Sequence, residues 1–191
     1  MHEYGTTEEH LASVAVKNHA NGQLNPRAHF EKETTIEEVL DSPPIADPFR
    51  LLDCCVFSDG ASAVVASPEA ADSFDEPVDI TGLGHATGIV PLADKESLTA
   101  TQAARDAATD AYDQVDIRPD NVDFGEVHDC FTGAEILATE SVGLFKDGEG
   151  DPVAAAGRTA LNGEVPINSS GGLKAKGGTR LVRPERQRLS S

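Results

Sequence analysis

The chain has 191 residues, of which 39% are hydrophobic and 25% are charged, a balance typical of a folded globular protein. Its formal net charge of −18 repels polyanions, which argues against nucleic acid or an anionic membrane surface as a partner. So acidic a surface suits a cytoplasm rich in salt, where screening weakens self-repulsion. No apolar run or leader predicts a membrane span or a signal peptide.

The three cysteines, Cys54, Cys55 and Cys130, do not predict a disulfide framework. Two of them are adjacent, where a disulfide is strained, and one thiol remains. Reduced thiols in a cytoplasmic protein are the simple interpretation. For the adjacent pair, buried core thiols are expected far more than a catalytic role.

Two capping boxes predict helix starts in the first third of the chain. Residues 6–9, Thr-Thr-Glu-Glu, precede apolar residues at helical spacing and predict a helix that runs to about Asn18. Thr35 and Glu38 open a second, short helix, which a pair of prolines ends. The polar residues 19–33 between the two helices predict a loop.

A domain boundary is predicted near the middle of the chain. Residues 63–66 predict a buried strand, and the acidic stretch from Pro68 to Pro77 predicts a linker. Beyond it, strands predicted at 78–80 and 122–127 alternate with helices. This order predicts an α/β fold with parallel strands and right-handed crossovers. A stripe of small residues, which allows close approach to a neighbour, marks the helix between the strands: Ala100, Ala103, Ala104, Ala107, Ala108, Ala111 and Val115.

Residues 126–131, Glu-Val-His-Asp-Cys-Phe, lie where the second predicted strand ends and a helix begins. Ligands bind at this edge of open α/β sheets. In an extended chain His128 and Cys130 point to the same side. The imidazole and the helix N-terminus predict a lowered pKa for Cys130, which would act as a nucleophile or a general acid/base. The residues leave a second interpretation open, a core histidine beside a buried cysteine.

A glycine-rich segment follows at residues 168–174, Asn-Ser-Ser-Gly-Gly-Leu-Lys. The pair Gly171 and Gly172 allows the backbone to approach a ligand closely and to adopt positive φ. Taken alone this is a weak indication, because Gly-Gly loops are usually turns.

Together, the two segments resemble the thiolase family, in particular its sterol-carrier-protein-type and archaeal branch. The matching motifs are His-Asp-Cys-Phe at 128–131 and Asn-x-x-Gly-Gly-Leu at 168–173, with Ser169 where the family has proline. The similarity covers nearly all of residues 1–176, and includes three further stretches: 14–19, 45–48 and 58–61.

The resemblance implies a thiolase-like layered α/β fold, present as an incomplete portion, and an acyltransferase of the acetyl-CoA acetyltransferase type. Such enzymes carry out a Claisen condensation or the thiolytic cleavage of a 3-oxoacyl-CoA. His128 would help form an oxyanion hole for a thioester carbonyl, and Cys130 would take the α-proton of acetyl-CoA. Asn168, Gly171 and Gly172 would shape the substrate site. Coenzyme A thioesters are the expected substrates, with no metal and no other cofactor.

The resemblance also divides the chain. Residues 1–76 would be the end of the N-terminal thiolase half, with a loop-rich helical segment, and residues 77–177 the first part of the C-terminal half. The family's nucleophilic cysteine lies upstream of the matching region, and a His-Pro-x-Gly-Ala-Thr-Gly motif is absent after Gly177. One allowed coding of residues 178–185 restores that motif when two bases are skipped. A frameshift near Gly177 and an aberrant, disordered tail at 178–191 are therefore predicted.

The chain alone is thus predicted to be inactive. Its expected partners are an acyl-CoA substrate and either further copies of itself or a complementing thiolase polypeptide. The alternative from another class is a non-catalytic subunit that binds acyl-CoA or acts as a scaffold in a thiolase complex. A metal site from the three cysteines and His128 is a distant third, because the spacing matches no usual zinc pattern.

Overall fold

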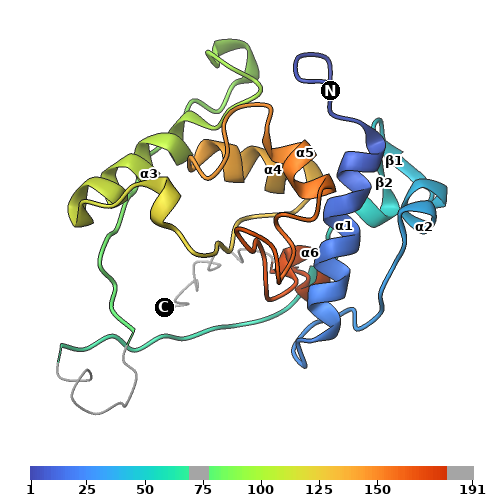
Figure 1. The fold of residues 1–191 in the computed structure, drawn as a ribbon, viewed down its shortest axis with the longest axis horizontal. Coiled ribbons are helices and arrows are strands. Elements are labelled where there is room, and N and C mark those ends of the chain that lie inside the picture. The colour runs from blue at the N-terminus through green and yellow to red at the C-terminus, as the bar shows by residue number, and fades with distance from the viewer. Residues whose placement is uncertain (69–77, 180–191) are drawn as a thin grey trace, which may run out of the picture.

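The computed structural model describes residues 1–68 and 78–179. In chain order the helices and strands are α1 (Glu8–Gln23), α2 (Ile36–Asp41), β1 (Pro44–Ala46), β2 (Phe49–Arg50), the 3-10 helix η1 (Leu51–Asp53), β3 (Phe57–Ser58), the 3-10 helix η3 (Leu92–Asp94), α3 (Gln102–Val115), the 3-10 helix η4 (Pro119–Asn121), α4 (Thr132–Ser141), α5 (Gly150–Ala155), α6 (Gly172–Lys176) and β4 (Gly178–Thr179). Helix α1 packs against α2, α4, α5 and α6, whereas α3 contacts α4 (Figure 1).

Helix α1 confirms the first predicted helix, with two differences. The Thr7 side chain accepts the His10 amide at 3.3 Å and the His10 ring pairs with the Thr7 amide at 3.4 Å, so the capping partner is a histidine rather than a glutamate. The helix also continues to Gln23 instead of ending near Asn18. Its last turn is buried against the glycine-rich loop, and this tertiary contact stabilises residues that were predicted to be loop.

The second capping box is confirmed at α2. Thr35 accepts the Glu38 amide at 3.2 Å, and the Glu38 carboxylate accepts the Thr35 amide at 3.1 Å. The helix ends at Asp41, before the two prolines. The chain then turns through the antiparallel pair β1–β2.

The apolar core lies on two faces of α1. On one face, Leu11 and Val14 pack with residues of α4 and α5 and with the half-buried ring of Phe49. On the other face, Ala12 and Ala15 pack against Val39 of α2. The core is therefore helical, and α1 is its centre.

The three predicted strands are not strands in this structure. The described sheets are the two-stranded pairs β1–β2, which is antiparallel, and β3–β4, which is parallel. Residues 63–66 were predicted to be buried, but Val64 is 84% and Val65 93% exposed. Residues 78–80 and 122–127 lack ladder partners except for one parallel bridge, Gly125 to Ile167. A β-prone sequence forms a strand only where a neighbouring strand accepts its hydrogen bonds, and the described residues supply few.

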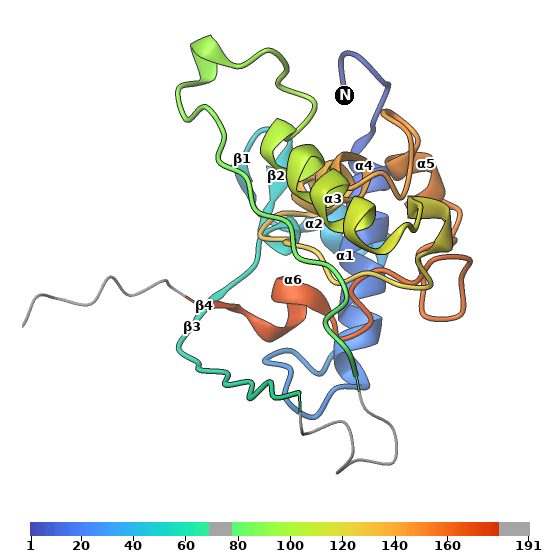
Figure 2. The ribbon, with the colours of Figure 1, turned by 90° about the vertical axis from the view of Figure 1, so that its left-hand side faces the viewer.

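The alanine stripe of α3 does bring a neighbour close, and that neighbour is an extended segment rather than a helix (Figure 2). A Cβ atom at Gly82 would come within 2.5 Å of the Ala111 carbonyl oxygen, and one at Gly84 within 1.7 Å of the Ala107 carbonyl oxygen. The chain from 82 to 84 thus lies directly on the backbone of α3. Glycine is required at these positions because any side chain would displace the segment.

Parts of two predictions lie outside the described residues. Residues 69–77, most of the predicted linker, are among them, and so are residues 180–191 of the predicted tail. Gly178 and Thr179 form β4, which pairs with β3. Among the helices that the structure describes, none is long and apolar enough to cross a membrane.

Candidate active site

The two motif segments, 125–131 and 167–177, lie side by side. Asn168 connects them, because its amide donates to the Gly125 carbonyl at 2.8 Å and its side-chain oxygen accepts the Val127 amide at 2.8 Å. The Ser170 amide donates to the Glu126 carboxylate at 2.8 Å. Residues that are about forty positions apart in sequence are therefore held in one unit, as the family resemblance implied.

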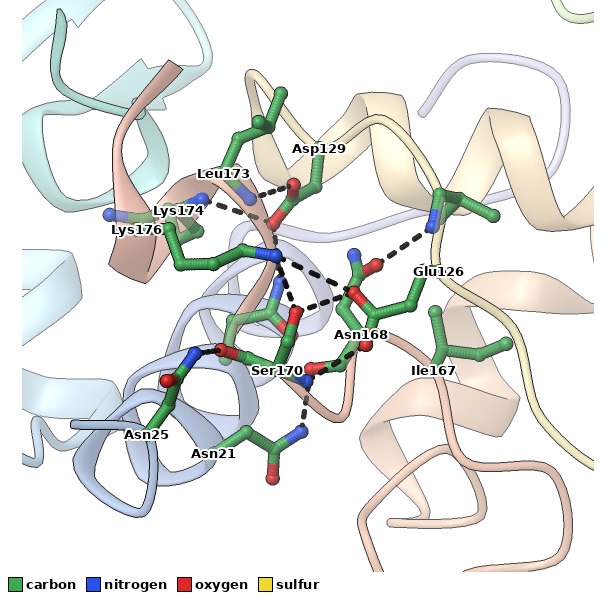
Figure 3. Close-up of polar contacts among 12 residues, drawn as sticks. Asn21, Asn25, Glu126, Asp129, Ile167, Asn168, Ser170, Leu173, Lys174 and Lys176 are labelled. Carbon is green, nitrogen blue, oxygen red and sulfur yellow. Dashed lines mark hydrogen bonds and ion pairs between the residues drawn. The ribbon is translucent and has the colours of Figure 1, made fainter. Parts of the chain in front are cut away.

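Asp129, between the two predicted catalytic residues, is the centre of this unit (Figure 3). Its side chain is fully buried and accepts the Leu173 amide at 2.6 Å, the Lys174 amide at 3.2 Å and the Asn18 side-chain amide at 2.8 Å. Burial raises the pKa of Asp129, and the two backbone amides act in the opposite direction. The carboxylate thus joins the start of α6 to α1 at Asn18.

The alternation of an extended chain explains where the neighbours of Asp129 point. With Asp129 turned inward, an extended backbone would direct His128 and Cys130 to the other side. His128 is exposed and Cys130 is half-buried. That both side chains face one side of the segment stays a prediction, and no hydrogen bond between them is among the described contacts.

The predicted activation of Cys130 is wrong in direction. Burial raises the pKa of the Cys130 thiol, and a negative charge on Cys55 would raise it further. The amide of Phe131 acts in the opposite direction but is outweighed. Helix α4 begins two residues further on, at Thr132.

A second carboxylate, that of Glu135 on α4, completes the support beneath the segment. It accepts the Asn18 side-chain amide at 2.7 Å, the Asn168 side-chain amide at 2.8 Å and the Lys17 ammonium at 2.7 Å. Lys17 also donates to the Ile167 carbonyl at 2.6 Å. Both members of the Lys17–Glu135 pair are almost completely buried, so removing either one would leave the other without its partner in the interior.

The side chain of Asn168, which was predicted to bind substrate, hydrogen-bonds to other residues of the protein in this structure. Its side chain is fully buried, and its backbone has φ of 54°, a conformation that asparagine tolerates better than most residues. Its carbonyl accepts the Asn21 side-chain amide at 3.0 Å. Asn168 therefore sets the shape of the loop, and direct contact with a substrate stays a prediction.

Gly171 and Gly172 permit the close approach that was predicted, and the partner is again the protein. Both have positive φ, 94° and 59°. A Cβ atom at Gly171 would lie 2.7 Å from the Gly22 Cα atom, and one at Gly172 would lie 2.2 Å from the Asp129 carboxylate. The glycine pair is thus required for the loop to pack on α1 and to receive Asp129.

Sequence reasoning missed a buried cation on α6. Lys174 is 1% exposed, donates to the Cys54 carbonyl at 3.0 Å and lies 3.4 Å from the His19 ring. Burial lowers the pKa of Lys174, and burial together with the Lys174 charge lowers the pKa of His19. The lowered pKa of His19 favours the neutral imidazole, whose ring nitrogen can accept a hydrogen bond from Lys174 Nζ.

The exposed rim of the loop is a polar contact of three side chains (Figure 3). Lys176 donates to the Ser170 hydroxyl at 2.6 Å, and that hydroxyl donates to Glu126 at 2.5 Å. Asn25 also donates to the Ser170 carbonyl at 2.8 Å. The rim fixes the loop from the solvent side while Asp129 fixes it from within.

The one cavity described lies apart from this unit, and the described residues form no metal site. A cavity of about 440 Å³ is lined by Glu3 and Tyr4, by residues 87–89, 95–97, 99–103 and 105–106, and by Asp147, and it includes none of the predicted site residues. Within residues 1–68 and 78–179, no three side chains of the metal-binding types converge as ligands for an ion.

Comparison with known proteins agrees with this geometry. Residues 84–181, just over half of the chain, match the family model described as thiolase C-terminal domain-like. The chain is 44% identical to the acetyl-CoA acetyltransferase of Methanothermobacter thermautotrophicus, over 93% of the chain and 47% of the relative. It is 35% identical to sterol carrier protein 2 of Oryctolagus cuniculus, over 93% of the chain and 34% of the relative.

The solved structure of the Ltp2-ChsH2(DUF35) aldolase superposes with a TM-score of 0.83 at 26% identity, covering 92% of this chain and 48% of that one. The chain thus spans about half the length of the archaeal relative and of this structural neighbour. What it holds is a portion of a thiolase-like fold. The chain belongs to the thiolase family, as the paired His-Asp-Cys-Phe and glycine-rich motifs indicated.

Proposed function

We propose that this chain supplies part of the active site of a thiolase-type acyltransferase, which forms or cleaves a carbon–carbon bond in a 3-oxoacyl-CoA thioester. Family membership and the name of the archaeal relative support the reaction class. The observation that carries the proposal is the buried Asp129 carboxylate. It joins both motifs, and of its two neighbours in sequence His128 is exposed and Cys130 is half-buried.

In this proposal His128 donates a hydrogen bond to the thioester oxygen of the acyl substrate. The negative charge that develops there in the enolate is stabilised best by donors held in place beforehand. Cys130, two residues further along the same face, takes the α-proton of the acetyl group as a thiolate and becomes a thiol. Asp129, Glu135 and Asn168 hold the backbone and so set the spacing between donor and base.

The raised pKa of Cys130 has a consequence for this role. Near neutral pH the thiol form predominates, and the thiolate that does form is the more strongly basic because it is desolvated. Proton abstraction should therefore accelerate as the pH rises toward the pKa of Cys130. A hydrogen-bond donor beside Cys130 would stabilise its thiolate and lower the pKa of the thiol.

We further infer that activity requires the part of the thiolase fold that this chain does not match. The chain spans about half of the archaeal relative, and the family resemblance assigns the acyl-carrying cysteine to the part that this chain does not match. The neighbouring structure is named for Ltp2 and ChsH2 together. Apolar side chains along the extended segment are also exposed, among them Val64, Val65, Val78 and Ile80, each more than 70% exposed.

The test is coexpression of the chain with the N-terminal half of the archaeal relative, followed by size exclusion and an acetoacetyl-CoA cleavage assay. The chain alone should show no turnover above background. The complex should be active, and Cys130→Ser should lower its rate by about 10²–10⁴-fold, the usual contribution of a general acid/base. Cys54→Ser is the matched control. The Cys54 thiol donates to the Arg50 carbonyl at 3.3 Å, on the side away from the proposed site.

Two outcomes would overturn the proposal. One is turnover by the isolated chain that Cys130→Ser abolishes, because a complementing polypeptide would then be unnecessary. The other is an active complex whose rate is the same with Cys130→Ser as with Cys54→Ser, since Cys130 would then not be the base.

A further inference from the structure

Cys55 and Cys130 face each other across a short antiparallel contact. Cys54 and Phe131 form an isolated antiparallel bridge, and the Cys55 amide donates to the Cys130 carbonyl at 3.0 Å. In an antiparallel pair, the residue after one bridge partner stands opposite the residue before the other. Residues 55 and 130 are therefore directly opposed, although they are far apart in sequence.

This arrangement places the two thiols on one face. Directly opposed residues of the hydrogen-bonded kind have Cα atoms about 5.5 Å apart and project their side chains to the same side. Disulfides need Cα separations of about 4.4–6.8 Å. Cys54, the residue before Cys55, points to the other face, where its thiol donates to the Arg50 carbonyl at 3.3 Å. Of the two neighbouring cysteines, only Cys55 is aligned with Cys130.

Two further observations agree with this placement. A negative charge on Cys55 would raise the pKa of the Cys130 thiol, as expected for groups in close proximity. All three cysteines are free and half-buried, so small reagents can reach them.

We propose that Cys55 and Cys130 form a redox-active dithiol, a modification site that a small-molecule disulfide of the glutathione class oxidises to an intramolecular disulfide. The site itself follows from the backbone pairing. Its effect on catalysis rests on the proposed function, because a disulfide at Cys130 removes the thiolate that would take the α-proton.

The chemistry is a two-step thiol–disulfide exchange. The thiolate of one cysteine attacks a sulfur atom of the small disulfide, forms a mixed disulfide and releases one small thiol. The thiolate of the opposing cysteine then attacks the protein sulfur of the mixed disulfide and releases the second small thiol. The two protein thiols are oxidised, the small disulfide is reduced to two thiols, and the two protons pass to those products.

The experiment is oxidation of the native full-length chain with oxidised glutathione, followed by trapping of free thiols with iodoacetamide and peptide mapping by mass spectrometry. The wild-type chain and the Cys54→Ser variant should each lose two thiols and give a peptide linked between Cys55 and Cys130. Cys55→Ser and Cys130→Ser should give no intramolecular link and should hold glutathione as a mixed disulfide. In urea the preference for the 55–130 link should disappear.

A wild-type chain that remains reduced, keeps only bound glutathione or links Cys54 to Cys55 would overturn the proposal. The mapping contains no acyl-CoA step, so its outcome does not depend on whether the chain takes part in thiolase catalysis. In the complex with the complementing polypeptide, oxidation should abolish turnover, and dithiothreitol should restore it. A linked chain that stays fully active would keep the dithiol but contradict the role of Cys130 as base.

Discussion

Helices α1 and α3 are similar in length but occupy opposite kinds of environment. Nine of the sixteen residues of α1 are buried, including Lys17, Asn18 and His19, whereas none of the fourteen residues of α3 is buried. Yet α3 has the more regular sequence, with its alanine stripe. Periodicity therefore identified a helix correctly without indicating how deeply it lies. Burial depends on what other segments supply, and α1 is surrounded by four helices while α3 contacts α4 and an extended strand-like segment (Figure 1).

The largest effect is expected where α1 carries a buried charge. Lys17→Met leaves Glu135 buried without its cation, and such a change typically costs about 3–5 kcal/mol. Urea denaturation followed by circular dichroism measures it. Arg158→Ala, which removes the pair with Glu164 on the surface, is the control and should cost about 0–1 kcal/mol. Equal shifts for the two variants would show that the network around α1 does not stabilise the fold.

A smaller loss is expected at the glycine loop. Gly172→Ala combines backbone strain at φ of 59° with a clash against Asp129, so about 2–5 kcal/mol is expected from about 1–2 for strain and about 1–3 for overpacking. Gly157→Ala is the matched control, because it has φ of 73° but no atom within 4 Å of the added Cβ. It should show the strain alone. If both variants unfold at the same urea concentration, Asp129 does not restrict the loop.

The thiol of Cys130 provides a third test, through its pH dependence. Because burial raises the pKa of Cys130 and only the thiolate reacts, alkylation by iodoacetamide should be slow at neutral pH and rise to a midpoint above the free value of about 8.5. Cys55→Ser removes a second cause of the shift and should move the midpoint downward. Residue-resolved mass spectrometry gives both rates. A midpoint below that of free cysteine would restore the activated thiol that the sequence predicted.

The smallest effect is expected from salt. With 33 acidic and 15 basic side chains, the chain repels itself, and the Debye length falls from about 10 Å at 0.1 M to about 3 Å at 1 M salt. We propose that the protein is adapted to a salty cytoplasm and predict that sodium chloride raises its urea midpoint. Chloride is preferred to sulfate, which stabilises proteins by exclusion. A midpoint that falls between 0.1 M and 1 M chloride would contradict the proposal.

Local signals predicted much of the helical structure. The caps at Thr7 and Thr35 marked two helix starts, because side chains three residues apart satisfy the free amides there. The strands predicted at 63–66, 78–80 and 122–127 are absent from the described sheets. A strand requires a hydrogen-bonding neighbour, which composition does not reveal.

The candidate site was predictable in part. The family resemblance indicated His128, Cys130 and the glycine loop as one unit, and the backbone of the unit is assembled as expected. Asp129 was missed, although the alternation that turned its neighbours outward required it to point inward and to find donors there. Asn18 and Glu135 gave no signal, because their contacts join residues more than a hundred positions apart.

Hydrogen exchange, followed by mass spectrometry, tests most directly the claim that a firmly held motif unit coexists with a segment that awaits a complementing polypeptide. In the isolated chain, the amides of α1 and those of Val127 and Leu173 should exchange slowly, because they are hydrogen-bonded within the core. Residues 59–66 and 85–90 should exchange within seconds, and should become protected when the N-terminal thiolase half is added. Slow exchange of residues 85–90 in the isolated chain, or no change on adding the half, would contradict the account.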